Sequence, residues 1–238
     1  MIYPIHGIKF PVNSNDMVIA HAKKNGGEFE PETIHIWKIV TAVLSGVVFD
    51  CGCYSGLFSA VAYKCNAENR VMAYDINPNN LDLFHEMRKT NFSCLMDSTF
   101  PQVCRKQGIH SHKTTLYADY KFAHSSAGKL NSSKSKELVE TTTIDDEYTE
   151  EVGWDSQIPV TAIKIDTEGN EIAVLEGAEH VIDSFKPLII AEGNTLQARI
   201  DLECKLRGLE YNRIWVADTR NVIAYNSDSM PFLLGHGK

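Results

Sequence analysis

The chain of 238 residues lacks the features that mark secreted, membrane-spanning and nucleic-acid-binding proteins. Its six cysteines are scattered and do not suggest the disulfide framework of a small secreted domain. No apolar run is long enough to cross a bilayer, and residues 1–6 lack the charged and then apolar pattern of a signal peptide. There is no run of lysine and arginine, and the formal net charge is −8. We therefore expect a cytoplasmic protein without a membrane or nucleic-acid partner.

The chain also lacks the glycine spacing of a dinucleotide-binding loop. A G-x-G-x-x-G motif that starts at Gly52 needs glycines at positions 54 and 57, where this chain has Tyr54 and Leu57. The second glycine of that motif lets the backbone approach a pyrophosphate, so the loop argues against NAD or FAD as the ligand.

What is present at this loop is an apolar strand at residues 47–49, then Asp50, a turn with Gly52 and Gly56, and a helix-forming segment from residue 57. Strand, tight turn and helix open a Rossmann-like unit, whose ligand lies over the carboxyl end of the strand. An acid before the turn repels phosphate but suits a ligand with an ammonium and a sulfonium. We therefore expect S-adenosylmethionine (SAM), with its carboxylate at the positive N-terminal end of the helix.

A second strand, residues 70–74, ends in Asp75, which lies 19 residues after Gly56. This offset matches that of the acid that accepts hydrogen bonds from ribose hydroxyls in Rossmann-like folds. The residues expected to bind the cofactor are Asp50, Gly52, Cys53, Tyr54, Gly56, Asp75, Ile76, Asn77 and Asp166.

Hydrophobic residues make up 43% of the chain and charged residues 23%, which is typical of one globular domain with a large core. We expect a single domain over residues 1–238, in which residues 1–45 are an N-terminal extension and a helix packed on the core. Residues 1–30 predict short extended pieces and turns, and residues 91–113 show no clear pattern. The expected helices cover residues 31–44, 81–88, 195–207 and a segment from 172. The expected strands include a third one within 114–122 and a C-terminal antiparallel hairpin of 211–217 and 221–225.

Four of the predicted strands end in an acid. Carboxyl ends of parallel strands lie at one edge of a doubly wound sheet, so these side chains should converge on one crevice. Converging carboxylates indicate a ligand that carries positive charge or hydroxyls. The four acids are Asp50, Asp75, Asp166 and Glu192.

These motifs resemble those of the FkbM family of SAM-dependent methyltransferases. The resemblance rests on residues 49–59, on Thr142-Thr143-Ile144-Asp145-Asp146, and above all on residues 163–171 followed by 174–178. It implies an α/β, Rossmann-like class I methyltransferase fold with a mostly parallel, doubly wound sheet that ends in an antiparallel hairpin. It also implies O-methylation of a hydroxyl on a polyketide or sugar, so the expected partner is a small-molecule or carbohydrate acceptor.

Methyl transfer to an alcohol benefits from a base that removes the hydroxyl proton. Asp166 is the first candidate, and Glu168, Glu192 and His124 are the others. Lys164 precedes Asp166 by two residues on a strand, so both should point to the same side, and an ion pair there would weaken Asp166 as a base. Mg²⁺ held by Asp166, Glu192 and Asn194 is an alternative arrangement, although we expect no metal.

Two other functions stay open at this stage. One is a methyltransferase that acts on RNA or protein, which the acidic net charge disfavours. The other is a non-catalytic Rossmann domain that binds a nucleotide or SAM. The segment at residues 124–136 predicts an exposed loop, either a lid or a mobile connection, and the oligomeric state is open between monomer and homodimer.

Overall fold

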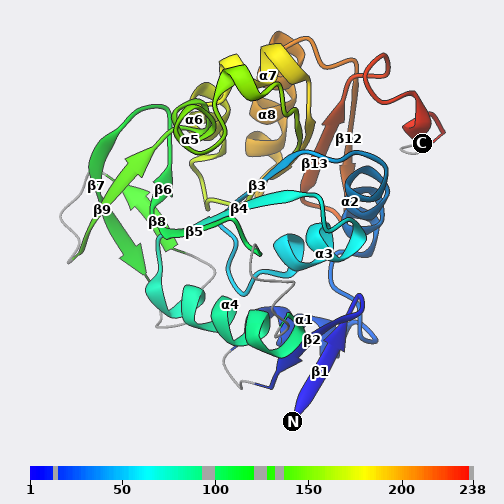
Figure 1. Cartoon of the computed structure of the whole chain (residues 1–238), viewed down its shortest axis with the longest axis vertical. Helices are drawn as coiled ribbons and strands as arrows, with labels where there is room; N and C mark the ends of the chain where they lie inside the picture. Colours follow the sequence, from blue (N-terminus) through cyan, green and yellow to red (C-terminus); the bar gives the residue numbers. More distant parts are fainter. Residues whose placement is uncertain (13–15, 93–99, 121–127, 132–136, 236–238) are drawn as a thin grey trace.

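A seven-stranded sheet forms the centre of the molecule (Figure 1). The structure is a computed structural model that describes residues 1–12, 16–92, 100–120, 128–131 and 137–235. The strand order is β12-β13-β11-β10-β3-β4-β5, and all strands run parallel except β13, which is antiparallel to both neighbours. The strands are β3 (Val47–Cys51), β4 (Arg70–Asp75), β5 (Val103–Lys106), β10 (Val160–Ile165), β11 (Leu188–Glu192), β12 (Arg213–Ala217) and β13 (Asn221–Tyr225).

Helices cover both faces of this sheet. One face carries α2 (Pro31–Val43), α3 (Leu57–Cys65) and α4 (Pro78–Asn91). The other carries α5 (Ile144–Glu151), α6 (Glu171–Glu176), α7 (Glu179–Phe185) and α8 (Leu196–Gly208). Side chains of β3 alternate between the two faces, since Val48 packs with the first group and Phe49 with the second. The predicted α/β, doubly wound sheet with a C-terminal antiparallel hairpin is therefore present.

The N-terminal segment adds a small unit beside α3 and α4 (Figure 1). It consists of the hairpin β1 (Ile2–Ile5) and β2 (Ile8–Pro11), followed by α1 (Met17–Lys24). The sequence did not predict α1, which has only eight residues. Its stability comes from tertiary packing, because Val18, Ile19 and Ala22 are buried, and from the Asp16 carboxylate, which accepts hydrogen bonds from the N–H groups of Val18 and Ile19.

A second, four-stranded sheet, which the sequence did not predict, lies beside the central one. It contains β6 (Gly108–Ile109), β9 (Glu137–Thr142), β7 (Thr114–Tyr120) and β8 (Gly128–Asn131), in this order. The strand predicted within 114–122 forms as β7 but lies in this second sheet. The parallel strand on the other side of β4 from β3 is β5, which lies within residues 91–113. The sequence shows no clear pattern there, because a strand of four residues is too short to produce one. The predicted loop at 124–136 contains β8, and its other residues lie outside the described ones.

Two helix boundaries also differ from the prediction. Helix α4 begins at Pro78, because Asn77 caps it through its side-chain oxygen, so the predicted turn includes the first turn of the helix. The helix expected from residue 172 is split into α6 and α7 around Gly177, where a side chain would collide with the backbone of His110. Among the described residues, no helix is long and apolar enough to span a membrane.

Helix α2 takes its N-terminal cap from a distant part of the chain. Glu30, at the capping position, adopts a left-handed conformation and makes no side-chain cap. The Asp218 carboxylate, in the turn between β12 and β13, accepts hydrogen bonds from the N–H groups of Glu32 (3.3 Å) and Thr33 (2.8 Å). The Glu32 carboxylate in turn accepts a hydrogen bond from the N–H of Asp218. This reciprocal pair joins the C-terminal hairpin to the N-terminal half of the fold.

Replacing Asp218 with alanine is expected to lower the free energy of unfolding by about 1–2 kcal/mol, because two N–H groups at the start of α2 lose their acceptor. Chemical denaturation measures the change. Asp183→Ala, which removes an exposed aspartate in a surface pair with Lys186, should change the value by less than about 0.5 kcal/mol. Equal losses in the two variants would contradict the capping role of Asp218.

Candidate active site

The four strand-end acids lie at one edge of the sheet, as predicted. Asp50 and Asp75 belong to the neighbouring strands β3 and β4, Asp166 directly follows β10, and Glu192 ends β11. Two hollows open at this edge, one of about 50 Å³ and one of about 330 Å³. Gly52, Tyr54 and Asp166 line both, so the hollows adjoin at the glycine loop. We refer to them as the slot and the large cavity.

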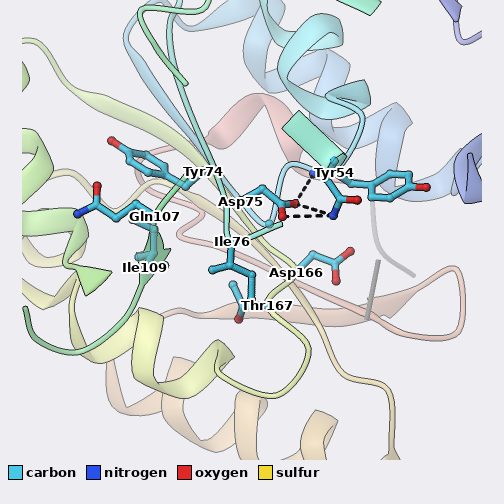
Figure 2. A pocket seen from close by; sticks show the side chains of 11 residues that line it. Tyr54, Tyr74, Asp75, Ile76, Gln107, Ile109, Asp166 and Thr167 are labelled. Carbon is cyan, nitrogen blue, oxygen red and sulfur yellow. Dashed lines mark hydrogen bonds between the residues drawn. The ribbon is translucent and has the colours of Figure 1, made fainter. Parts of the chain in front are cut away.

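The slot lies beyond the end of β4 (Figure 2). Its walls carry the apolar side chains of Ile76 and Ile109 and the ring of Tyr74, whose hydroxyl donates to Glu147 on α5. The sequence did not single out Tyr74, Ile109, Gln107 or Thr167, which also line it. No local signal could have found Gln107 and Ile109, because they lie in the stretch without a pattern.

Asp75 forms one wall of the slot and is tightly held. Its carboxylate accepts hydrogen bonds from the N–H of Tyr54 (2.9 Å) and the side-chain amide of Asn80 (Figure 2). It also accepts one from the N–H of Asn77 (2.8 Å). Burial raises the pKa of Asp75 to about 6, although these hydrogen bonds oppose the change. The position at the carboxyl end of β4 is the one predicted for a ribose acceptor.

The glycine loop needs its glycines for contacts within the protein. Gly52 has φ +83°, and a side chain there would lie far inside van der Waals distance of the Asp166 carbonyl oxygen. Gly56 has φ +82°, and a side chain there would collide with the ring of Phe84 on α4. The loop can therefore approach β10 on one side and α4 on the other only without side chains at these positions. Gly56 lines neither hollow, and Asn77, which caps α4, does not either.

Asp50 connects the large cavity to helix α3. Its carboxylate accepts hydrogen bonds from the N–H (3.0 Å) and the hydroxyl (2.6 Å) of Ser59 in the first turns of that helix. Burial raises the pKa of Asp50 to about 6, and the hydrogen bond with Ser59 partly offsets this. Asp50 and Cys53 both line the large cavity.

Charged groups form one side of the large cavity. The Lys164 ammonium lies 3.5 Å from a carboxylate oxygen of Asp166, so the predicted ion pair is present. Arg220, in the turn of the C-terminal hairpin, lies 2.9 Å from the Glu192 carboxylate. Asn194 donates hydrogen bonds to Glu192 and Glu168, which brings the third predicted acid to the same group. The sequence did not single out Arg220.

Asp166 and Glu192 have opposite pKa shifts. Burial alone would raise the pKa of Asp166, but the Lys164 ammonium and a hydrogen bond with Glu192 outweigh it and hold this pKa below its usual range. Burial and the nearby charge of Asp166 raise the pKa of Glu192 to about 8. The two carboxyl groups therefore share one proton near neutral pH, with the negative charge on Asp166.

The acids could also be considered as metal ligands. Oxygen atoms of Asp166, Glu168 and Glu192 lie within 4.8 Å of one another, and among the described residues this is the one group of at least three acidic, histidine or cysteine side chains with such spacing. Lys164 and Arg220 already place positive charge beside two of these carboxylates. A divalent cation would therefore have to compete with them.

The opposite side of the large cavity is mostly apolar and comes partly from the N-terminal unit. Helix α1 contributes Met17, Val18 and Ala20 to this lining, together with the basic residues His21 and Lys24, and the start of α3 contributes Leu57 and Phe58. The hydroxyl of Tyr54 accepts a hydrogen bond from the N–H of Met17, which ties α1 to the glycine loop. His124, one of the predicted bases, lies outside the described residues.

The sequence model of the methyltransferase FkbM domain matches residues 50–214, more than half of the chain. Among solved structures, methyltransferase FkbM from Methylobacillus flagellatus KT is similar, with 19% identity and a TM-score of 0.54 over 82% of this chain. This chain spans 50% of that protein's length. A precorrin-6y C5,15-methyltransferase from Geobacter metallireducens GS-15 has 12% identity and a TM-score of 0.48, over 82% of this chain and 88% of that one. No curated protein matches the chain.

The likeness to the solved FkbM structure confirms the predicted class I methyltransferase fold. The match of the domain model includes the glycine loop, the slot-lining Asp75 and the acids at the ends of β10 and β11. The chain therefore belongs to the FkbM family of methyltransferases.

Proposed function

We propose that this chain is a SAM-dependent O-methyltransferase that acts on a hydroxyl of a small molecule or sugar. The observation that carries the proposal is the position of the Asp166–Glu192 acid pair beside the junction of the slot and the large cavity. A methyl donor held in the slot would present its reactive end at this junction, within reach of an acceptor in the large cavity.

The residues of the slot fit the nucleoside part of SAM, the donor that the methyltransferase fold implies. Asp75 offers carboxylate oxygens for ribose hydroxyls, and Ile76 and Ile109 offer apolar surface for a base. Gly52 and Tyr54 lie where the slot meets the large cavity. When bound, SAM supplies a methyl group on a sulfonium that leaves as a neutral thioether as the acceptor oxygen takes the methyl.

The acid pair supplies a place for the hydroxyl proton. Asp166, the first candidate from the sequence, is held ionised by Lys164 and is a weak base. Glu192 has the higher pKa, so once ionised it is the stronger acceptor of a proton. We infer that Glu192 receives the hydroxyl proton and that Asp166 and Arg220 set its charge state.

The large cavity suits an acceptor with one apolar and one polar side. Its mostly apolar wall comes from α1 and α3 and includes His21 and Lys24, and its charged wall comes from β10, β11 and the hairpin turn. Its volume of about 330 Å³ is within the usual range for small-molecule pockets. The acids at this edge and the net charge of −8 argue against an RNA acceptor.

The proposal is tested by titrating the full chain calorimetrically with SAM and, separately, with NAD. We expect SAM to bind with a dissociation constant on the order of micromolar and NAD not to bind. Asp75→Ala should weaken SAM binding by about tenfold or more, because the ribose loses a charged acceptor. The control is Asp82→Ala, which changes an exposed aspartate on α4 and should bind SAM as the wild type does.

If the wild-type chain does not bind SAM, the proposed function is excluded and only the fold remains established. If SAM binds, transfer of radiolabelled methyl groups from SAM to a panel of hydroxylated sugars and small molecules distinguishes an enzyme from a binding domain. Labelling of RNA or protein, but not of these compounds, would overturn the assigned acceptor class.

A further inference from the structure

Two basic side chains of helix α1 line the large cavity. His21 and Lys24 lie in the last turn of α1 and are exposed, so they stand at the open side of the cavity. Lys23, the third basic residue of that turn, does not line the cavity, and its ammonium lies 5.5 Å from the centre of the Tyr3 ring. The helix dipole favours basic residues at this end but does not select the side on which they lie.

The basic pair, His21 and Lys24, has no anionic partner in the part of the chain that the structure describes. No carboxylate forms an ion pair with Lys24 there, and no hydrogen-bond partner is found for its ammonium or for the His21 ring. The other two basic residues of the lining, Lys164 and Arg220, each contact a carboxylate. The positive charge that a ligand can use is therefore on the α1 side of the cavity.

An aromatic contact holds His21 in place. Its ring meets the ring of Phe29 edge to face, with the ring centroids 5.3 Å apart. Phe29 also lines the cavity, and its main-chain oxygen lies 2.6 Å from Nε2 of His6 in the N-terminal hairpin. Because the imidazole is already packed at the cavity, it loses little side-chain freedom when it binds a ligand.

Helix α1 has a fixed position relative to the glycine loop. The N–H of Met17, at the start of the helix, donates to the Tyr54 hydroxyl (2.9 Å), and Val18, Ile19 and Ala22 are buried. The basic pair therefore has a set position across the cavity from the acid pair. An acceptor with a negative charge would be repelled by the acid pair unless its charged group pointed toward α1.

We propose that the acceptor carries an anionic group, a carboxylate or a phosphate, which His21 and Lys24 bind while the reacting hydroxyl lies at Glu192. The inference rests on the proposed function, since it concerns the acceptor of the same site. A sugar acid or a sugar phosphate combines hydroxyls with one such group. Binding the anion at α1 would turn the hydroxyls toward the acid pair, so the basic pair selects and orients the acceptor. Neither residue lines the slot.

The test measures the transfer of radiolabelled methyl groups from SAM, by the full chain, to matched compounds. Each neutral compound of the panel that tests the proposed function is compared with its carboxylate and its phosphate, such as glucose with glucuronic acid and glucose 6-phosphate. We expect kcat/KM for an anionic member to exceed that for its neutral counterpart by at least about tenfold. This ratio should fall as salt is added, because exposed charges are screened. The carboxylate and phosphate arms show which anion the site takes.

Two substitutions remove the basic groups with little change in shape. Lys24→Met keeps most of the length of the side chain, and His21→Phe keeps a ring against Phe29. In the double variant the ratio should fall close to one, through a higher KM for the anionic member at an unchanged kcat. Both positions are exposed, so the double variant should fold and bind SAM as the wild type does. The matched control is Lys23→Met, in the same turn but beside Tyr3, which should keep the wild-type ratio.

The outcomes distinguish this inference from the proposed function. Equal kcat/KM values for neutral and anionic members would overturn the inference and leave the proposed function in place. A preference for anions that survives in the double variant would overturn the assignment of the anion to α1. If no member of any matched set is methylated, the proposed function fails and the inference fails with it.

Discussion

Replacing Glu192 with glutamine is expected to lower kcat/KM for methyl transfer by about 10²–10⁴-fold, the usual effect of losing a general base. Glutamine has the same shape but cannot take a proton, and its single amide oxygen can keep one of the two contacts that Glu192 makes through different oxygens, with Arg220 (2.9 Å) or with Asn194 (2.8 Å). SAM binding should change little, because Glu192 lines the large cavity and not the slot. Glu203→Gln, on the exposed side of α8, is the control and should retain full activity.

The pH dependence distinguishes Glu192 from Asp166 as the base. A base must be ionised, and burial beside Asp166 raises the pKa of Glu192 to about 8. With Glu192 as the base, kcat/KM should rise about tenfold per pH unit below pH 8 and level off above it. With Asp166 as the base, the profile should be flat over this range, because its pKa is held low. A flat profile, with activity lost in Asp166→Asn and retained in Glu192→Gln, would contradict the assignment to Glu192.

Replacing Gly52 with alanine is expected to reduce the free energy of unfolding by about 3 kcal/mol or more and to abolish SAM binding. A methyl group at this position would collide with the backbone oxygen of Asp166, which is not free to move because it follows β10 directly. The left-handed conformation of Gly52, at φ +83°, adds strain for any residue with a side chain. Removing this collision would require β3 and β10 to separate at the edge where the slot and the large cavity meet.

Gly153→Ala is the matched control for this substitution. Gly153 also has a positive φ, +79°, with a ψ of 136° that lies outside the left-handed helical region, but an added side chain would meet no atom within 4 Å. It should lose about 1–3 kcal/mol from backbone strain alone. The difference between the two variants in chemical denaturation measures the close approach of the glycine loop to β10. Similar losses in both would show that this approach does not limit the position.

Much of the site was accessible from local sequence patterns. An apolar run that ends in an acid and a glycine turn predicts strand, loop and helix, because these preferences act over a few residues. The parallel arrangement then places Asp50, Asp75, Asp166 and Glu192 at one edge whatever the details of packing. The period of two along a strand put Lys164 beside Asp166. Local preferences and the geometry of parallel strands were therefore enough to locate the carboxylates and the glycine loop.

The structure alone decided which residues complete the site and how its acids ionise. Helix α1 and strand β5 are too short for local preference to define them, and packing against the rest of the chain holds them in place. Arg220 reaches Glu192 because the C-terminal hairpin lies beside β11, a contact between segments far apart in sequence.

The chemistry of the site also depends on contacts between segments that are far apart in sequence. The pKa difference between Asp166 and Glu192 depends on burial, on Lys164 and on Arg220 together, and no short stretch of sequence contains all of these. Likewise the cap on α2 comes from Asp218, at the other end of the chain. The sequence by itself determined the elements and the edge at which the acids gather, since local patterns encode both. Contacts between distant segments exist only in the folded chain, and they decided that α1 lines the large cavity and which acid is the proposed base.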